Sequence, residues 1–105
     1  MERKVSDLYG STSAAVSAIR EAVSDALSVS MYATDSLYWN NCYLARGEGD
    51  EEIRVLENSD PLDGGPFEPD FATYQVLVWI NGTTRSAIVR QRLEAAGLQH
   101  LKHEA

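Results

Sequence analysis

The sequence predicts an α+β domain, a two-layer sandwich in which two helices cover one face of a mainly antiparallel sheet. Segments whose apolar residues recur at helical spacing are interleaved with short segments of strand character. The connection at residues 47–50, GEGD, is typical of a hairpin, which joins antiparallel strands. A ferredoxin-like or split βαβ topology fits this order best, because right-handed crossovers place both helices on the same face. With 105 residues the chain supplies one core, so we expect a single domain, 1–105.

The first third of the chain predicts a short strand and a helix. Residues 3–9 alternate weakly between apolar and polar side chains, as in a strand. A glycine and three hydroxyl residues at 10–13 then favour a break and a helix cap. From residue 14 to 28 the apolar residues recur at helical spacing and predict an amphipathic helix. Its apolar stripe consists of Val16, Ile19, Val23, Ala26 and Leu27.

The middle of the chain changes to strand periodicity. Strands are predicted over residues 29–34, 37–46 and 51–58, the last two joined by the hairpin. Residues 59–70 contain three prolines and two glycines, which exclude a long regular element and predict a partly rigid loop. Loops of this length inside compact domains are often functional.

The most strongly predicted unit is the strand, turn and helix within residues 71–98. Residues 74–80, YQVLVWI, are mostly β-branched or aromatic and predict a central strand. Asn81-Gly82 is expected to end it, and Thr83 or Thr84 to cap the following helix. Gly97 predicts a left-handed helix stop, after which residues 98–101 suit a closing strand.

The apolar faces of these elements define a predicted core. Within the second helix Ile88, Val89, Leu93 and Ala96 recur at helical spacing. The side chains expected to be largely buried are Val16, Ile19, Val23, Ile53, Val76, Val78, Trp79, Ile80, Ile88 and Leu93.

The negative charge is concentrated in one segment. The chain carries a formal charge of −7, but residues 48–70 hold nine acids and one base, a net −8, and the remainder is +1. A chain without clustered Lys and Arg is a poor candidate for binding nucleic acid. We expect the segment to meet a cationic protein through Asp50, Glu51, Glu52, Glu57, Asp60, Asp63, Glu68 and Asp70. Internal ion pairs are the simpler role for Arg85, Arg90 and Arg92.

Aromatic residues at 32–43 offer a second candidate for partner binding. Some of these rings pack in the core, but strand alternation places others on the outside unless both faces are covered. Trp39 and Tyr43 fall on one side of their strand, and such a pair beside the acidic segment would suit an interface hot spot.

Candidate chemical groups lack the partners that catalysis or metal binding requires. The acids of the loop do not have the spacing of a calcium-binding loop, so no metal is predicted there. His100 and His103 would suit two ligands of a zinc site if they lay on a helix, but no third ligand is evident. We therefore interpret them as part of an exposed tail. The single cysteine, Cys42, excludes an internal disulfide and is interpreted as a core residue.

These observations favour a small acidic binding protein without catalytic activity or cofactor. No apolar run reaches the length of a membrane span, and the first residues lack the apolar region of a secretory signal, so a cytoplasmic location is expected. Bacterial immunity proteins, which mask a toxin, are similar in size and charge only. Two alternatives stay open, a small ferredoxin-like dimeric enzyme and a structural or regulatory subunit. A homodimer is compatible with each.

Overall fold

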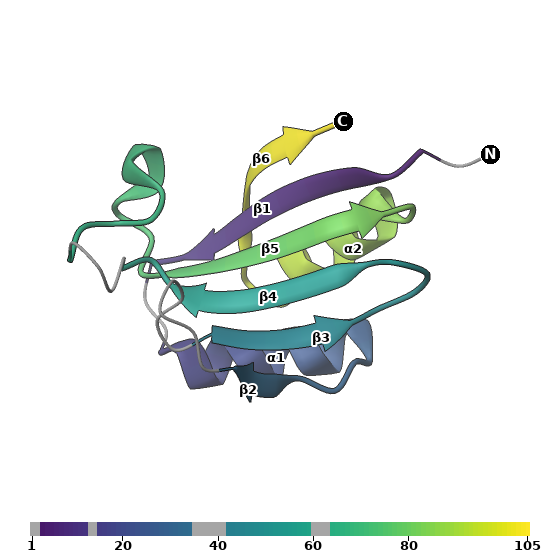
Figure 1. Cartoon of the computed structure of the whole chain (residues 1–105), viewed down its shortest axis with the longest axis horizontal. Helices are drawn as coiled ribbons and strands as arrows, with labels where there is room; N and C mark the ends of the chain where they lie inside the picture. Colours follow the sequence, from purple (N-terminus) through teal and green to yellow (C-terminus); the bar gives the residue numbers. More distant parts are fainter. Residues whose placement is uncertain (1–2, 13–14, 35–41, 60–63) are drawn as a thin grey trace.

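The computed structural model describes residues 3–12, 15–34, 42–59 and 64–105, and these contain six strands and two α-helices (Figure 1). In chain order the elements are β1 (Val5–Ser11), α1 (Val16–Leu27), β2 (Tyr32–Thr34), β3 (Cys42–Arg46), β4 (Glu52–Glu57), the 3-10 turn η1 (Pro69–Phe71), β5 (Val76–Thr83), α2 (Ser86–Ala95) and β6 (Gln99–Glu104). Neither helix within the described ranges is long and apolar enough to cross a membrane.

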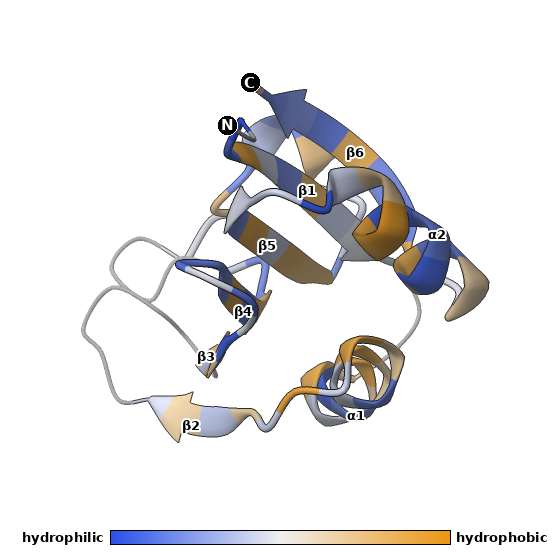
Figure 2. Ribbon diagram, turned by 90° about the vertical axis from the view of Figure 1, so that its right-hand side faces the viewer, coloured by the Kyte–Doolittle hydropathy of each residue, from blue (hydrophilic) through white to orange (hydrophobic). Residues whose placement is uncertain are grey.

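The six strands form one sheet in the order β2-β3-β4-β5-β1-β6, and every neighbouring pair is antiparallel. Figure 2 shows α1 and α2 together on one side of this sheet. The predicted α+β fold with an antiparallel sheet is therefore confirmed. The ferredoxin-like or split βαβ topology is not confirmed, because the chain adds β2 and β3 at one edge of the sheet before it reaches β4.

The main core lies between the sheet and the helices. From α1 it receives Ile19, Val23 and Leu27, whose four-residue spacing places them on one side of the helix. α2 contributes Val89 and Leu93 at the same spacing. The strand residues that face them are Tyr9, Ala45, Ile53, Val55, Val76, Val78 and Ile80.

Three residues of the predicted core are not buried. Ile88 is 49% exposed, so its assignment to the core is wrong. Val89 and Leu93 face the sheet, and Ile88 is rotated from Val89 by roughly 100° about the helix axis, which turns it toward solvent. Val16 and Trp79 are half-buried at the margins of the packed regions.

The opposite face of the sheet carries a smaller apolar cluster of Leu8, Cys42, Leu56 and Leu77. Within the described ranges, the loop around η1 covers one end of this face through Phe67, Phe71 and Tyr74, which pack on the cluster. This loop lies at the left end of the sheet in Figure 1. The helices are on the other side, so among the described residues no helix covers the rest of this surface, which we call the open face.

A bulge in β5 replaces the strand end predicted at Asn81-Gly82. The strand continues to Thr83, and the pairing with β1 shifts by one residue between Ile80 and Thr83. Gly82 adopts a φ of 68°, a conformation that glycine accepts without strain, so the dipeptide bends the strand without ending it.

The end of α2 follows the predicted stop. Gly97 has a φ of 95°, and the N–H of Leu98 donates to the carbonyl of Leu93 at 3.0 Å, as in a Schellman motif. The start differs, because the residue at the N-cap position is Arg85 and it caps with no side-chain hydrogen bond. The Thr83 hydroxyl oxygen accepts a hydrogen bond from the Arg85 N–H, and the same hydroxyl donates to the carboxylate of Glu51.

Candidate functional site

The open face of the sheet carries a row of side chains that crosses all six strands. Cross-strand pairing aligns them in register, one residue from each strand, in the order Tyr32, Leu44, Arg54, Trp79, Leu8 and Lys102. The Lys102 ammonium lies 5.1 Å from the centre of the Trp79 ring, a cation–π distance. Tyr32, on the edge strand β2, is 53% exposed, Leu8 is fully buried, and the other four members are half-buried. We call this set the open-face row.

Charged residues surround Trp79 on the same face. A pocket of about 400 Å³ is lined by Glu52, Arg54, Trp79, Asn81 and Glu104. Within it the Arg54 Nε donates to Glu52 at 2.7 Å, and Lys102 lies 3.3 Å from Glu104. The bases beside the tryptophan are thus matched by carboxylates of the protein itself.

The described carboxylates of the acidic segment lie toward both ends of β4. Asp50 is exposed in the β3–β4 hairpin, where Lys4 pairs with it. At the other end Asp70 is exposed, and Glu68 lies 4.0 Å from Lys102. Glu57, the last residue of β4, is half-buried. Three predicted binding residues, Trp39, Asp60 and Asp63, fall outside the described residues.

Glu51 does not belong to the exposed acidic surface, although the sequence suggested it. Its side chain is 0% exposed. The Arg85 guanidinium donates to both carboxylate oxygens, at 2.7 and 3.1 Å, and the Thr83 hydroxyl donates at 2.6 Å. Burial alone would raise the pKa of Glu51, but the bonds from Arg85 and Thr83 outweigh it and hold the pKa below its ordinary value. Glu51 therefore ties the hairpin to the turn before α2, and Arg85 has the internal ion pair that the sequence predicted.

Gly47 is required for this arrangement. A Cβ at this position would collide with the carboxylate of Glu51, and the Gly47 N–H donates to the Glu51 carbonyl at 3.0 Å. The hairpin glycine thus leaves room for a buried acid.

Tyr43 and Cys42 point to opposite faces of β3. Tyr43 packs against the main core on the helix side, with the Arg20 guanidinium 5.1 Å from its ring centre. Tyr43 is therefore not on the open face, and its predicted place in an outward aromatic pair is wrong. Cys42 is buried in the smaller cluster, as predicted.

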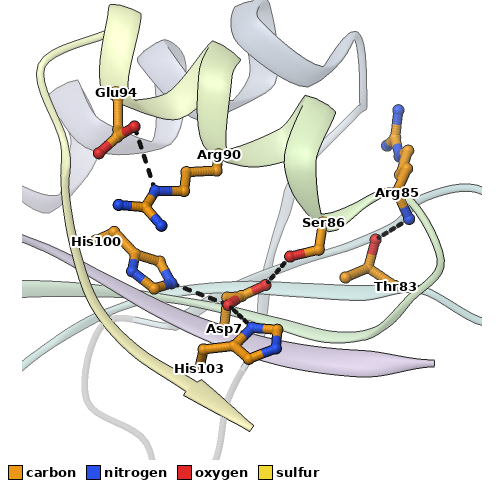
Figure 3. Close-up of polar contacts among 8 residues, drawn as sticks. All are labelled: Asp7, Thr83, Arg85, Ser86, Arg90, Glu94, His100 and His103. Carbon is orange, nitrogen blue, oxygen red and sulfur yellow. Dashed lines mark hydrogen bonds and ion pairs between the residues drawn. The ribbon is translucent and has the colours of Figure 1, made fainter. Parts of the chain in front are cut away.

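A second polar site lies on the helix side of the sheet, beneath the start of α2 (Figure 3). Its centre is Asp7 of β1, whose side chain is 1% exposed. One carboxylate oxygen, Oδ1, lies 2.9 Å from His100 Nε2 and 2.6 Å from His103 Nδ1. The other, Oδ2, accepts a hydrogen bond of 2.7 Å from the Ser86 hydroxyl. We call these four residues the Asp7 cluster.

A bulge in β6 brings the two histidines to the same side. In a regular strand residues three apart point to opposite faces. Here the pairing with β1 shifts between Leu8 and Tyr9, so Leu101 is an extra residue in β6. His100 then lies opposite Tyr9 and His103 opposite Asp7, and both rings reach the same carboxylate.

The surroundings of the Asp7 cluster combine a pocket with buried aromatic packing. A cavity of about 420 Å³ is lined by the four cluster residues, Ala87 and Arg90. The Tyr9 ring packs edge-on against His100 with centroids 5.1 Å apart. Its buried hydroxyl has no hydrogen-bond partner among the described residues, and burial raises the pKa of Tyr9. Burial also acts to raise the pKa of Asp7, but the bonds from His100, Ser86 and His103 leave that pKa lowered.

The tail predicted for His100 and His103 is wrong, because both lie in the paired strand β6. The predicted exposure holds for His103, whose side chain is 47% exposed, but not for His100. Sequence reasoning found no third ligand, and the structure supplies Asp7. One signal was present: an acid in the predicted first strand shares a face with Tyr9, and a buried acid requires partners. The partners themselves lie 93 and 96 residues away.

Comparisons with protein-family models, with curated proteins and with solved structures find no match to this chain.

Proposed function

We propose that the protein binds a cationic protein partner through the open face of its sheet, in the manner of an immunity protein that masks a toxin. The observation that carries this proposal is the open-face row, with Trp79 near its middle and acids at both ends of β4. A cytoplasmic location and a binding activity without catalysis are parts of the same proposal.

The composition of the open face supports protein binding. Trp, Tyr and Arg are the residues most often found at interface hot spots, and the open-face row contains one of each. The described loop covers only one end of this face, and the helices cover the other side. A partner bound on this face would form a third layer, on the side of the sheet opposite the helices.

The charge balance supports a cationic partner. Arg54 and Lys102 on this face are already paired with Glu52 and Glu104. The surplus charge lies outside the row, on exposed acids such as Asp70; Asp50 is also exposed, although Lys4 pairs with it. An acidic rim around an aromatic centre favours association with basic surfaces, chiefly through the association rate.

We also infer that the sheet is an extended form of the ferredoxin-like arrangement. When β2 and β3 are left out, the remaining elements follow one another as β1-α1-β4-β5-α2-β6, a βαββαβ sequence. The two added strands enlarge the open face, and β2 brings Tyr32 to the open-face row.

Removal of exposed acids should slow partner association without unfolding the protein. In a triple variant with Glu48→Gln, Asp50→Asn and Asp70→Asn, we expect the association rate with a basic partner protein, isolated from lysate of the source cells on the wild-type chain, to fall by roughly tenfold at low salt. Its dependence on salt should also become flatter, because fewer charges attract the partner. Stopped-flow or surface-resonance kinetics at several ionic strengths would measure both effects.

The helix side offers a control of equal charge. A triple variant with Glu21→Gln, Asp25→Asn and Glu94→Gln removes three exposed acids from α1 and α2. This variant should associate at nearly the wild-type rate. Equal slowing of the two variants would show that only net charge matters and would contradict a specific acidic rim.

A further inference from the structure

We propose that Asp7, His100 and His103 bind a divalent transition-metal ion such as zinc, with Asp7 Oδ1, His100 Nε2 and His103 Nδ1 as ligands. The three ligand atoms lie within 4.8 Å of one another. This site is on the helix side of the sheet and is independent of the proposed docking face.

The donor set determines which metal fits. Two imidazole nitrogens and one carboxylate oxygen suit zinc and similar ions, whereas calcium and magnesium prefer oxygen ligands throughout. Three protein ligands leave a further coordination position open to water or another small ligand. The pocket of about 420 Å³ at the cluster gives such a ligand room.

Two of the three ligand–ligand distances require only a small adjustment, and the third, between the two imidazole nitrogens, is at most 4.8 Å. In a tetrahedral zinc site, with metal–ligand bonds near 2.0–2.1 Å, neighbouring ligand atoms are roughly 3.3 Å apart. The two contacts of Asp7 Oδ1, at 2.9 and 2.6 Å, would open by several tenths of an ångström. The hydrogens that the imidazole nitrogens direct at Oδ1 would move to the opposite ring nitrogen or leave as protons.

Neighbouring residues hold the ligands in place. Ser86 donates to Asp7 Oδ2, the oxygen that faces away from the two rings, so it can fix the carboxylate while Oδ1 binds a metal. The edge of Tyr9 against His100 restrains that ring. Ser86 therefore acts as a positioning residue whose loss should weaken metal binding without abolishing it.

The sequence contains few residues that could bind zinc through nitrogen or sulfur. His100 and His103 are the only two histidines of the sequence, and Cys42 is its only cysteine. Cys42 is buried on the opposite face of the sheet. Zinc bound through imidazole must therefore involve these two residues, provided that the protein carries no histidine tag.

Calorimetric titration of the tag-free, chelator-treated full chain with Zn²⁺ tests the site. We expect saturable binding of one ion per chain and a Tm that rises with zinc concentration. Titration with Co²⁺ should give the visible absorption of a low-coordinate cobalt site with nitrogen ligands. His103→Gln should remove the cobalt spectrum, and Ser86→Ala should weaken zinc binding by ~10–100-fold.

Glu104→Gln is the matched control, because it removes a carboxylate from the same edge strand on the open-face side. This variant should bind zinc like the wild type. If His103→Gln fails to fold, as judged by circular dichroism, the wild-type cobalt spectrum and Ser86→Ala still decide the matter. Absence of saturable zinc binding, or binding that neither His103→Gln nor Ser86→Ala weakens, would overturn the proposal.

Discussion

Replacement of Glu51 by Ala should lower the free energy of unfolding by about 3–5 kcal/mol, the cost of removing one partner from a buried ion pair. The change leaves the Arg85 guanidinium, 12% exposed, without its bidentate acceptor, and it also removes the acceptor of the Thr83 hydroxyl. Both groups sit where the β3–β4 hairpin meets the turn before α2. Urea denaturation monitored by circular dichroism would measure the change.

The neighbouring acid Glu48 provides the control. Glu48 is mostly exposed, and its carboxylate lies 3.8 Å from Arg85 Nε, too far for a hydrogen bond. Glu48→Ala should therefore cost less than about 1 kcal/mol. Similar losses in the two variants would mean that Glu51 has no special role in the hairpin.

The contribution of Glu51 should also depend on pH. Its pKa in the folded chain is lowered, so its stabilising effect is fully present above the unfolded value, about 4.3, and is lost as the pH falls through the folded value. The stability difference between wild type and Glu51→Gln should therefore shrink in acid. A difference that grows as the pH falls would contradict this assignment.

Replacement of Leu93 by Ala should cost about 2–5 kcal/mol, because Leu93 is fully buried between α2 and the sheet. The substitution removes apolar contacts and leaves a cavity in the main core. Denaturant unfolding is again the measurement, with an unchanged slope expected if the fold is retained.

Ile88 on the same helix is the matched control. It is half-exposed, and Ile88→Ala should cost less than about 1 kcal/mol. A larger loss for Ile88→Ala than for Leu93→Ala would reverse the assigned face of α2.

The elements that periodicity specifies strongly were predictable. The stripe of Ile19, Val23 and Leu27 gives the helix and its buried face from local spacing alone. The apolar run before Asn81 likewise gives β5, and Gly97 gives the end of α2. Sheet order was less accessible, because pairing of β1 with β5 and β6 depends on contacts between the two ends of the chain.

The Asp7 cluster could not be predicted for a related reason. Its assembly requires β1 to pair with β6 and a bulge at Leu101 that reverses the side on which His103 lies. The charge count placed Glu51 wrongly on the exposed binding surface. A count of acids does not distinguish an exposed carboxylate from one buried against Arg85. The open-face row was also hidden, since it draws one residue from each of six strands.

Site-specific photocrosslinking tests the central claim, that the open face binds a cationic protein, most directly. A benzophenone amino acid would replace Tyr32, on the open-face row, or Ile88, on the outer side of α2; both native side chains are about half exposed. In lysate of cells that naturally make the protein, we predict a crosslink from position 32 to a basic protein, weakened by salt, and none from position 88. Equal crosslinks from both positions, or a crosslink from position 32 to a second copy of this chain alone, would contradict the account.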